Sequence, residues 1–164
     1  MPSRSSNSKP SRAATLLRTR HLAVAGLLLV LLPAAAAAVE FRSIAPPKAV
    51  LYDSPSEAGG KRYILGQGYP VEVIVDLGAW IKVRDNQGGL SWIEAKQLAT
   101  QRTVLVTQDQ AEIRQSADAG SAVRARVEQD VVLEMLEPPS NGWIKVRHRD
   151  GLTGYILASS VWGY

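Results

Sequence analysis

The stretch Trp80-Ile81-Lys82-Val83-Arg84 occurs a second time, unchanged, as Trp143-Ile144-Lys145-Val146-Arg147. Matching residue types continue on both sides, with a shift of 62 positions before Pro138-Pro139 and 63 after it. A self-match at this period is typical of a repeated structural unit. Two units are too few for a solenoid, so we expect two tandem small domains, each with its own core.

Both halves of the repeat read as short strands separated by Gly, Pro and Asp, without a sustained helical period. The expected strands lie near residues 49–52, 62–65, 71–75, 80–84 and 90–93, then near 103–107, 111–114, 124–127, 131–136, 143–147 and 154–157. About five short strands per copy favour a strongly bent antiparallel barrel, because so small a sheet must curl to hide its apolar face and edges. The expected fold class is all-β, with two tandem small barrels.

Residues 1–38 differ from the rest of the chain in charge. They hold five of the nineteen Lys and Arg residues and no acid, so fourteen cations face fifteen acids in the remainder. The net charge of that remainder is close to −1. A nucleic-acid-binding protein needs a basic face to neutralise phosphates, so this balance argues against nucleic acid as a partner.

The order of elements in residues 1–38 is typical of a secretory signal. A basic, Ser-rich start precedes an uncharged apolar run at 22–32 and small residues at 34–38. Two interpretations remain open: a signal cleaved after Ala38, or an uncleaved membrane anchor, since residues 22–39 are about long enough to cross a bilayer. We favour cleavage, because Pro33 and five alanines weaken the apolar character. We expect an exported protein of the periplasm or cell envelope, with domains at 39–99 and 100–164, that meets the membrane only if the segment stays uncleaved.

The chain has no cysteine, which excludes disulfides, thiolate zinc sites, iron–sulfur clusters and thiol nucleophiles. Beyond residue 38 the one histidine is His148, between Arg147 and Arg149. A catalytic triad needs a base held by a carboxylate beside a nucleophile, and no such set is visible. We therefore expect no catalytic residue, no metal site and no cofactor.

The repeated tryptophan stands out by its position in the strand. Alternation of side chains places Ile81 and Val83 in the core and Trp80 on the opposite, cationic face, and the second copy repeats this with Trp143. Either each indole covers neighbouring Lys and Arg stems as a structural cap, or it forms the floor of a shallow ligand groove.

The second copy resembles the bacterial SH3 domain. The resemblance is carried by Gly142 to Val146, a short turn, Gly154-Tyr155-Ile156 and a small helical turn ending at Val161, with residues 111–116 similar to the family's first strand and loop. Residues 42–98 and 103–161 would each be one such domain. The resemblance implies a binding or targeting module of exported proteins, associated with peptidoglycan or its peptides.

The chain departs from the signalling type of SH3 domain where that type binds proline-rich ligands. Ser54 replaces a tyrosine after Leu51-Tyr52-Asp53, and Leu157 and Ser160 replace the proline and tyrosine of the closing motif. Stacked aromatic residues are needed to receive a polyproline helix, so such ligands are not expected.

The sequence as a whole predicts a non-catalytic exported module that recognises peptidoglycan peptides through a shallow aromatic groove. The alternative is a periplasmic protein–protein adaptor for an envelope enzyme or sensor, so the expected partner is a cell-wall peptide or an envelope protein. The candidate ligand-binding residues are aromatic or lie at the mouth of the first long loop: Tyr52, Asp53, Tyr69, Trp80, Trp92, Trp143 and Tyr155.

Overall fold

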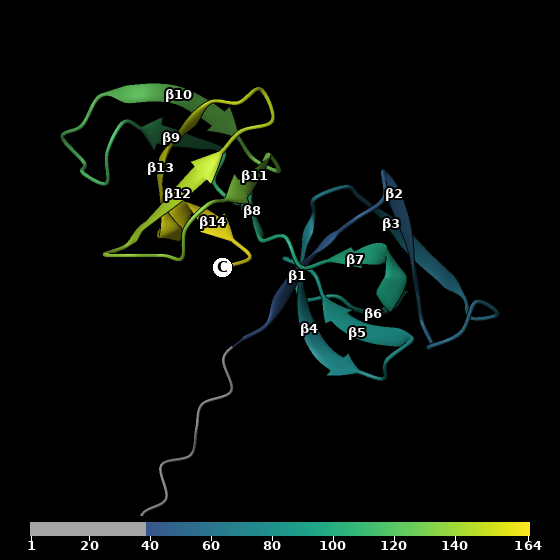
Figure 1. Ribbon diagram of the computed structural model, residues 1–164. Helices are drawn as coiled ribbons and strands as arrows, with labels where there is room; N and C mark the ends of the chain where they lie inside the picture. Colours follow the sequence, from purple (N-terminus) through teal and green to yellow (C-terminus); the bar gives the residue numbers. More distant parts are fainter. Residues whose placement is uncertain (1–38) are drawn as a thin grey trace, which may run out of the picture. The chain divides into compact units, whose positions relative to one another are not determined.

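The computed structural model describes residues 39–164, and the expected export signal at 1–38 lies outside them. The described chain forms two antiparallel sheets of seven strands each, with 3-10 turns and no α-helix (Figure 1). The prediction of an all-β chain with two tandem SH3-like barrels is confirmed. No helix in this part of the chain has the length and apolar character needed to cross a membrane.

Each sheet contains one copy of the sequence repeat. The elements of the first copy are β1 (Phe41–Ile44), β2 (Lys48–Tyr52), β3 (Lys61–Gly66), β4 (Pro70–Asp76), β5 (Trp80–Arg84), β6 (Leu90–Glu94), η1 (Ala95–Gln97) and β7 (Leu98–Ala99). The elements of the second copy are β8 (Thr103–Val106), β9 (Gln110–Arg114), β10 (Val123–Glu128), β11 (Val132–Met135), β12 (Trp143–Arg147), β13 (Thr153–Leu157), η2 (Ala158–Ser160) and β14 (Val161–Trp162). The strand orders are β3-β2-β6-β5-β4-β1-β7 and β10-β9-β13-β12-β11-β8-β14, so the two copies share one topology.

The structure adds strands to the five expected per copy. β1 is the counterpart of β8, and only β8 was foreseen from the sequence. β1 pairs with β4 and with the two-residue strand β7, which follows the 3-10 turn. In this way the last strand of each copy returns to the first.

The two copies also agree in how their first long loop is closed. The loop after β2 closes with a hydrogen bond from the Asp53 N–H to the Gly60 carbonyl at 3.0 Å, and the loop after β9 closes with the equivalent bond from Gln115 to Ala122 at 2.9 Å. The two copies therefore share the closure of this loop, whereas the turn before Trp143 is one residue longer than the turn before Trp80.

Each barrel encloses its own apolar core. The strand β5 buries Ile81 and Val83, at 0% and 1% exposure, whereas Trp80 is half-buried on the other face. The strand β12 repeats the pattern with Ile144 and Val146. This confirms the alternation read from the sequence. A fully buried aliphatic side chain contributes about 1.5–3 kcal/mol, so these positions stabilise the barrel that presents the tryptophan.

The copies are joined by a short junction with direct contacts. The Thr103 hydroxyl donates to the Gly68 carbonyl at 2.6 Å. The ring of Phe41 meets Trp162 edge to face, with 5.0 Å between centroids, and the Arg102 guanidinium lies 5.6 Å from the Phe41 centroid. Trp162 is therefore a packing residue.

Candidate functional site

The indole of Trp80 lines an open hollow of about 650 Å³ on the first copy. Three segments surround it: the loop after β2, the turn before β5, and the end of β6 with η1. The lining residues are Pro55, Ser56, Glu57, Ala79, Trp80, Glu94, Ala95 and Lys96. We call this hollow the Trp80 groove. Its volume lies within the range of small-molecule sites.

Tyr52 holds the indole in place. Its ring meets Trp80 edge to face, with 5.4 Å between centroids and an interplanar angle of 88°. Aromatic pairs prefer this arrangement, because the positive edge of one ring faces the negative face of the other. Tyr52 is only 8% exposed, so it supports Trp80 from within the barrel.

Charged side chains meet at one wall of the Trp80 groove. The Lys96 ammonium lies 2.5 Å from a carboxylate oxygen of Glu94. Their hydrogen bond lowers the pKa of Glu94 and raises the pKa of Lys96, and the nearby charge of Glu57 raises the pKa of Lys96 further. Lys96 is thus paired with Glu94, and Glu57 is a second carboxylate among the residues that line the groove.

The equivalent place on the second copy keeps the tryptophan but not the charges. A shift of 62 or 63 positions puts Ala119, Leu157 and Ser159 where the first copy has Glu57, Glu94 and Lys96. Arg114 replaces Tyr52, and it donates to the Ser121 carbonyl at 2.6 Å and pairs with Glu112 at 2.5 Å. Trp143 therefore lacks both the aromatic support and the charged wall.

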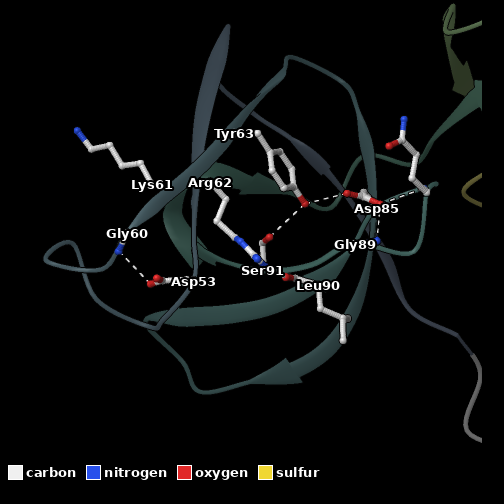
Figure 2. Close-up of a pocket in the computed structure, with 10 residues that line it drawn as sticks. Asp53, Gly60, Lys61, Arg62, Tyr63, Asp85, Gly89, Leu90 and Ser91 are labelled. Atoms are coloured by element: carbon white, nitrogen blue, oxygen red, sulfur yellow. Dashed lines mark hydrogen bonds between the residues drawn. The ribbon is translucent and has the colours of Figure 1, made fainter.

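A second hollow, of about 560 Å³, lies on another part of the first copy (Figure 2). The Tyr63 hydroxyl donates to Asp85 Oδ2 at 2.8 Å and accepts from Ser91 Oγ at 3.1 Å. Asp85 Oδ1 accepts the backbone N–H groups of Gln87 and Gly89 at 2.9 and 2.8 Å. Burial is the main cause of the raised pKa of Tyr63. These polar groups bind one another and hold the β5–β6 hairpin against β3.

Asp53 belongs to this second hollow and stabilises the loop of residues 53–60. Its Oδ1 accepts the Gly60 N–H at 2.9 Å and the Ser54 hydroxyl at 3.0 Å. The same loop carries Pro55 to Glu57, which form a wall of the Trp80 groove. Asp53 therefore acts on the groove through the loop.

Arg62 crosses the second hollow and donates to the Leu90 carbonyl at 3.1 Å, as Figure 2 shows. Arg124 makes the same bond to the Thr153 carbonyl at 2.8 Å in the second copy. These two arginines were not predicted as functional residues from the sequence. An arginine stands at equivalent positions of both copies, and this repetition is the sequence signal from which the pair could have been predicted.

The other predicted site residues are dispersed. Tyr69 donates to the Asn86 side chain in a separate hollow, and burial raises the pKa of Tyr69 to about 12. Trp92 is half-buried, with the Lys82 ammonium 5.8 Å from its ring centroid. Tyr155 pairs across strands with Lys145 and Arg114. Of the two aromatic ring pairs in residues 39–164, Tyr52–Trp80 is the one formed by predicted site residues.

His148 lies at the turn between β12 and β13, where its Nδ1 is 2.9 Å from Asp150 Oδ1. Asp150 Oδ1 also accepts the backbone N–H of Leu152 at 3.0 Å. Residues 39–164 contain no group of three or more His, Cys, Asp or Glu side chains arranged to hold a metal ion.

The topology and the repeated strand pattern define a protein of two tandem SH3-like barrels. Residues 45–99 and 107–163 match the bacterial SH3 domain, once in each copy, and the chain belongs to that family. The resemblance read from the sequence is therefore confirmed. No curated protein matches the chain.

The chain is also similar to three longer proteins of known structure, each with a TM-score of 0.35. NlpC1 from Trichomonas vaginalis is 19% identical, over 83% of this chain and 50% of that one. NlpC2 from the same organism is 16% identical, over 76% and 48%. An NlpC/P60 family protein from Bacillus cereus is 16% identical, over 76% and 56%. The chain spans about half the length of these proteins.

Proposed function

We propose that the chain is a non-catalytic, exported binding module that recognises peptide parts of peptidoglycan through the Trp80 groove. The observation that carries this proposal is the indole of Trp80, which Tyr52 holds at the floor of an open hollow. An indole held in this way supplies rigid amphipathic contact area, and such an anchor is worth about 2 kcal/mol in an interface. Membership of the bacterial SH3 domain family supports a cell-wall-associated binding role.

The non-catalytic part of the proposal is supported by how the polar side chains are used. Asp85 accepts hydrogen bonds from Tyr63 and from two backbone N–H groups, and His148 is paired with Asp150. These groups stabilise turns and hairpins of the barrels. Export is proposed from the signal-like pattern of residues 1–38, and the place of action from the family.

The first experiment is co-sedimentation of residues 39–164 with purified bacterial wall sacculi. This fragment is suitable because it contains both apolar cores. We expect saturable pelleting that soluble wall fragments compete away. An absence of pelleting at high protein concentration would reject the peptidoglycan proposal and leave an envelope protein as the partner to be sought.

The variants Trp80→Ala and Trp143→Ala form a matched pair for this assay. We expect Trp80→Ala to weaken pelleting by tenfold or more, since the loss of about 1.4 kcal/mol or more corresponds to that factor. Trp143→Ala should pellet like the wild type, because its surroundings lack the aromatic support of Tyr52. Far-UV circular dichroism shows whether each variant is folded. Equal losses in the two folded variants would contradict a groove in the first copy.

A further inference from the structure

The charged wall of the Trp80 groove contains two carboxylates and one ammonium group. Glu57 and Glu94 come from different segments, the loop after β2 and the end of β6, and both lie at the groove. Lys96 is the one cation among the lining residues. The wall therefore carries one more negative than positive charge, in a groove that the indole of Trp80 also lines.

The two side chains of the Glu94–Lys96 pair differ in their exposure to solvent. The Glu94 side chain is 12% exposed, whereas the Lys96 side chain is 75% exposed. Exposed ion pairs of this kind are weak, and exposed lysine side chains change rotamer in nanoseconds. Lys96 can therefore leave while the carboxylate stays in place.

Removal of Lys96 from this position would leave two carboxylates in the groove that the indole of Trp80 also lines. An ammonium group is stabilised both by carboxylates and by the negative face of an aromatic ring. We propose that the Trp80 groove recognises a primary ammonium group on its ligand, and that the Lys96 ammonium occupies this position in the free protein. This inference rests on the proposed function of the same groove.

The second copy supports the assignment by comparison. It keeps the tryptophan and the closing hydrogen bond of the first long loop but has Ala119, Leu157 and Ser159 in place of the three charged residues. The barrel fold therefore does not need these charges. Their presence at the groove of the first copy alone is what a ligand-specific role requires.

A ligand carboxylate bound by Lys96 is the opposite possibility, and it predicts the opposite effect of removing the lysine. The Lys96→Met variant would lose the attractive charge and bind such a ligand more weakly. If Lys96 instead competes with a ligand ammonium, the same variant binds more tightly. One substitution therefore separates the two ligand chemistries by the sign of its effect.

The test is an NMR titration of ¹⁵N-labelled residues 39–164 with the capped peptide acetyl-Ala-Lys-Ala-amide. The indole N–H signal of Trp80 reports on the groove, and that of Trp143 is the internal reference. We expect the peptide to shift Trp80 and not Trp143. Lys96→Met should bind about threefold to fivefold more tightly, and Glu94→Gln should bind more weakly by a similar factor, the range for an exposed charge pair.

Two controls complete the experiment. The peptide with an acetylated lysine side chain has no ammonium group and should leave the Trp80 signal unchanged. The variant Lys145→Met removes the lysine that pairs with Glu137 at 2.6 Å on the second copy, and it should titrate like the wild type.

The inference is overturned if the acetylated peptide binds equally well, if Lys96→Met binds more weakly, or if neither protein responds to the peptide. Pelleting of the wild type with sacculi would still support the proposed function in each of these cases. Failure of the ammonium inference is thus distinguishable from failure of peptidoglycan binding.

Discussion

At the scale of single residues, the sequence predicted which side chains are buried better than which side chains meet. Alternation along β5 placed Ile81 and Val83 in the core, and both are fully buried. The charged wall of the Trp80 groove was not foreseen, because Glu57 is separated from Glu94 and Lys96 by more than half of the first copy. Alternation gives the face of a strand, but it does not give the path of a loop.

Tyr69 gives a prediction about pH at the same scale. Its pKa is raised from an ordinary value near 10 to about 12, chiefly by burial. The unfolded chain therefore loses this proton first as the pH rises, so the contribution of Tyr69 to stability is full below pH 10 and is lost between pH 10 and about 12. Water reaches part of the ring, so we expect a loss of about 1 kcal/mol, below the full linkage value for such a shift.

The measurement for Tyr69 is urea unfolding of the wild type and of Tyr69→Phe at pH values from about 9 to about 12, at intervals of ~1 pH unit. This range includes the pKa of Tyr69 in the unfolded chain and its pKa in the folded chain. The wild type should lose more stability over this range than the variant, because phenylalanine has no proton to release. Parallel stability curves for the two proteins would contradict the raised pKa. Tyrosinate absorbance in the folded protein gives an independent reading.

At the scale of elements, the strands with a clear hydrophobic alternation were predicted and the others were not. β2 to β6 and β8 to β13 lie where the sequence placed strands. β1 was missed because Phe41-Arg42-Ser43-Ile44 shares no residue type with its counterpart Thr103 to Val106. β7 and β14 have two residues each, too few for any periodicity to show, and they form because the 3-10 turn returns the chain to β1 and β8.

The loop of residues 53–60 is the element whose stability should control the groove. The carboxylate of Asp53 accepts the Gly60 N–H at 2.9 Å, and Pro55 to Glu57 lie between these two residues. We expect Asp53→Ala to lower the free energy of unfolding by about 1 kcal/mol, the usual value for one hydrogen bond. It should also weaken binding to sacculi, because the wall of the Trp80 groove is no longer fixed.

The matched control for the loop is Asp53→Asn, which keeps an oxygen that can accept the Gly60 N–H. Asn should retain most of the stability and most of the binding. Urea unfolding and sacculus pelleting measure the two effects separately. If Asp53→Ala and Asp53→Asn were equally impaired in binding, the charge of Asp53 would matter more than its hydrogen bond.

At the scale of the whole molecule, the two copies have one backbone plan and different surfaces. The repeat in the sequence predicted the shared topology, since apolar residues at equivalent strand positions require similar packing. It also showed that Tyr52 has an arginine, Arg114, as its counterpart, which pointed to the first copy as the more aromatic. Comparison of the two copies in the sequence could not show that the substituted positions line one groove. They do so because the loop after β2 lies close to η1, and the sequence does not give this approach.

If aromatic support and charge are what distinguish the two grooves, the second copy should gain a site when both are supplied. The variant Ala119→Glu with Leu157→Glu supplies the two carboxylates at exposed positions, so the fold should tolerate it. Adding Arg114→Tyr supplies the ring beneath Trp143. Ser159 is left unchanged, since a lysine there would compete with the ligand.

In a titration with the capped lysine peptide, we expect the Trp143 indole signal, silent in the wild type, to shift in the grafted variant while the Trp80 signal shifts as before. The double variant should shift less than the triple variant, because an unsupported indole is held less rigidly and binding then costs more ordering entropy. The Trp143 signal also reports whether the second barrel is still folded, through its native position before peptide is added. A folded triple variant whose Trp143 signal never moves would mean that the aromatic support and the carboxylates are not sufficient for recognition, and that the loop sequence Pro55-Ser56 must contribute as well.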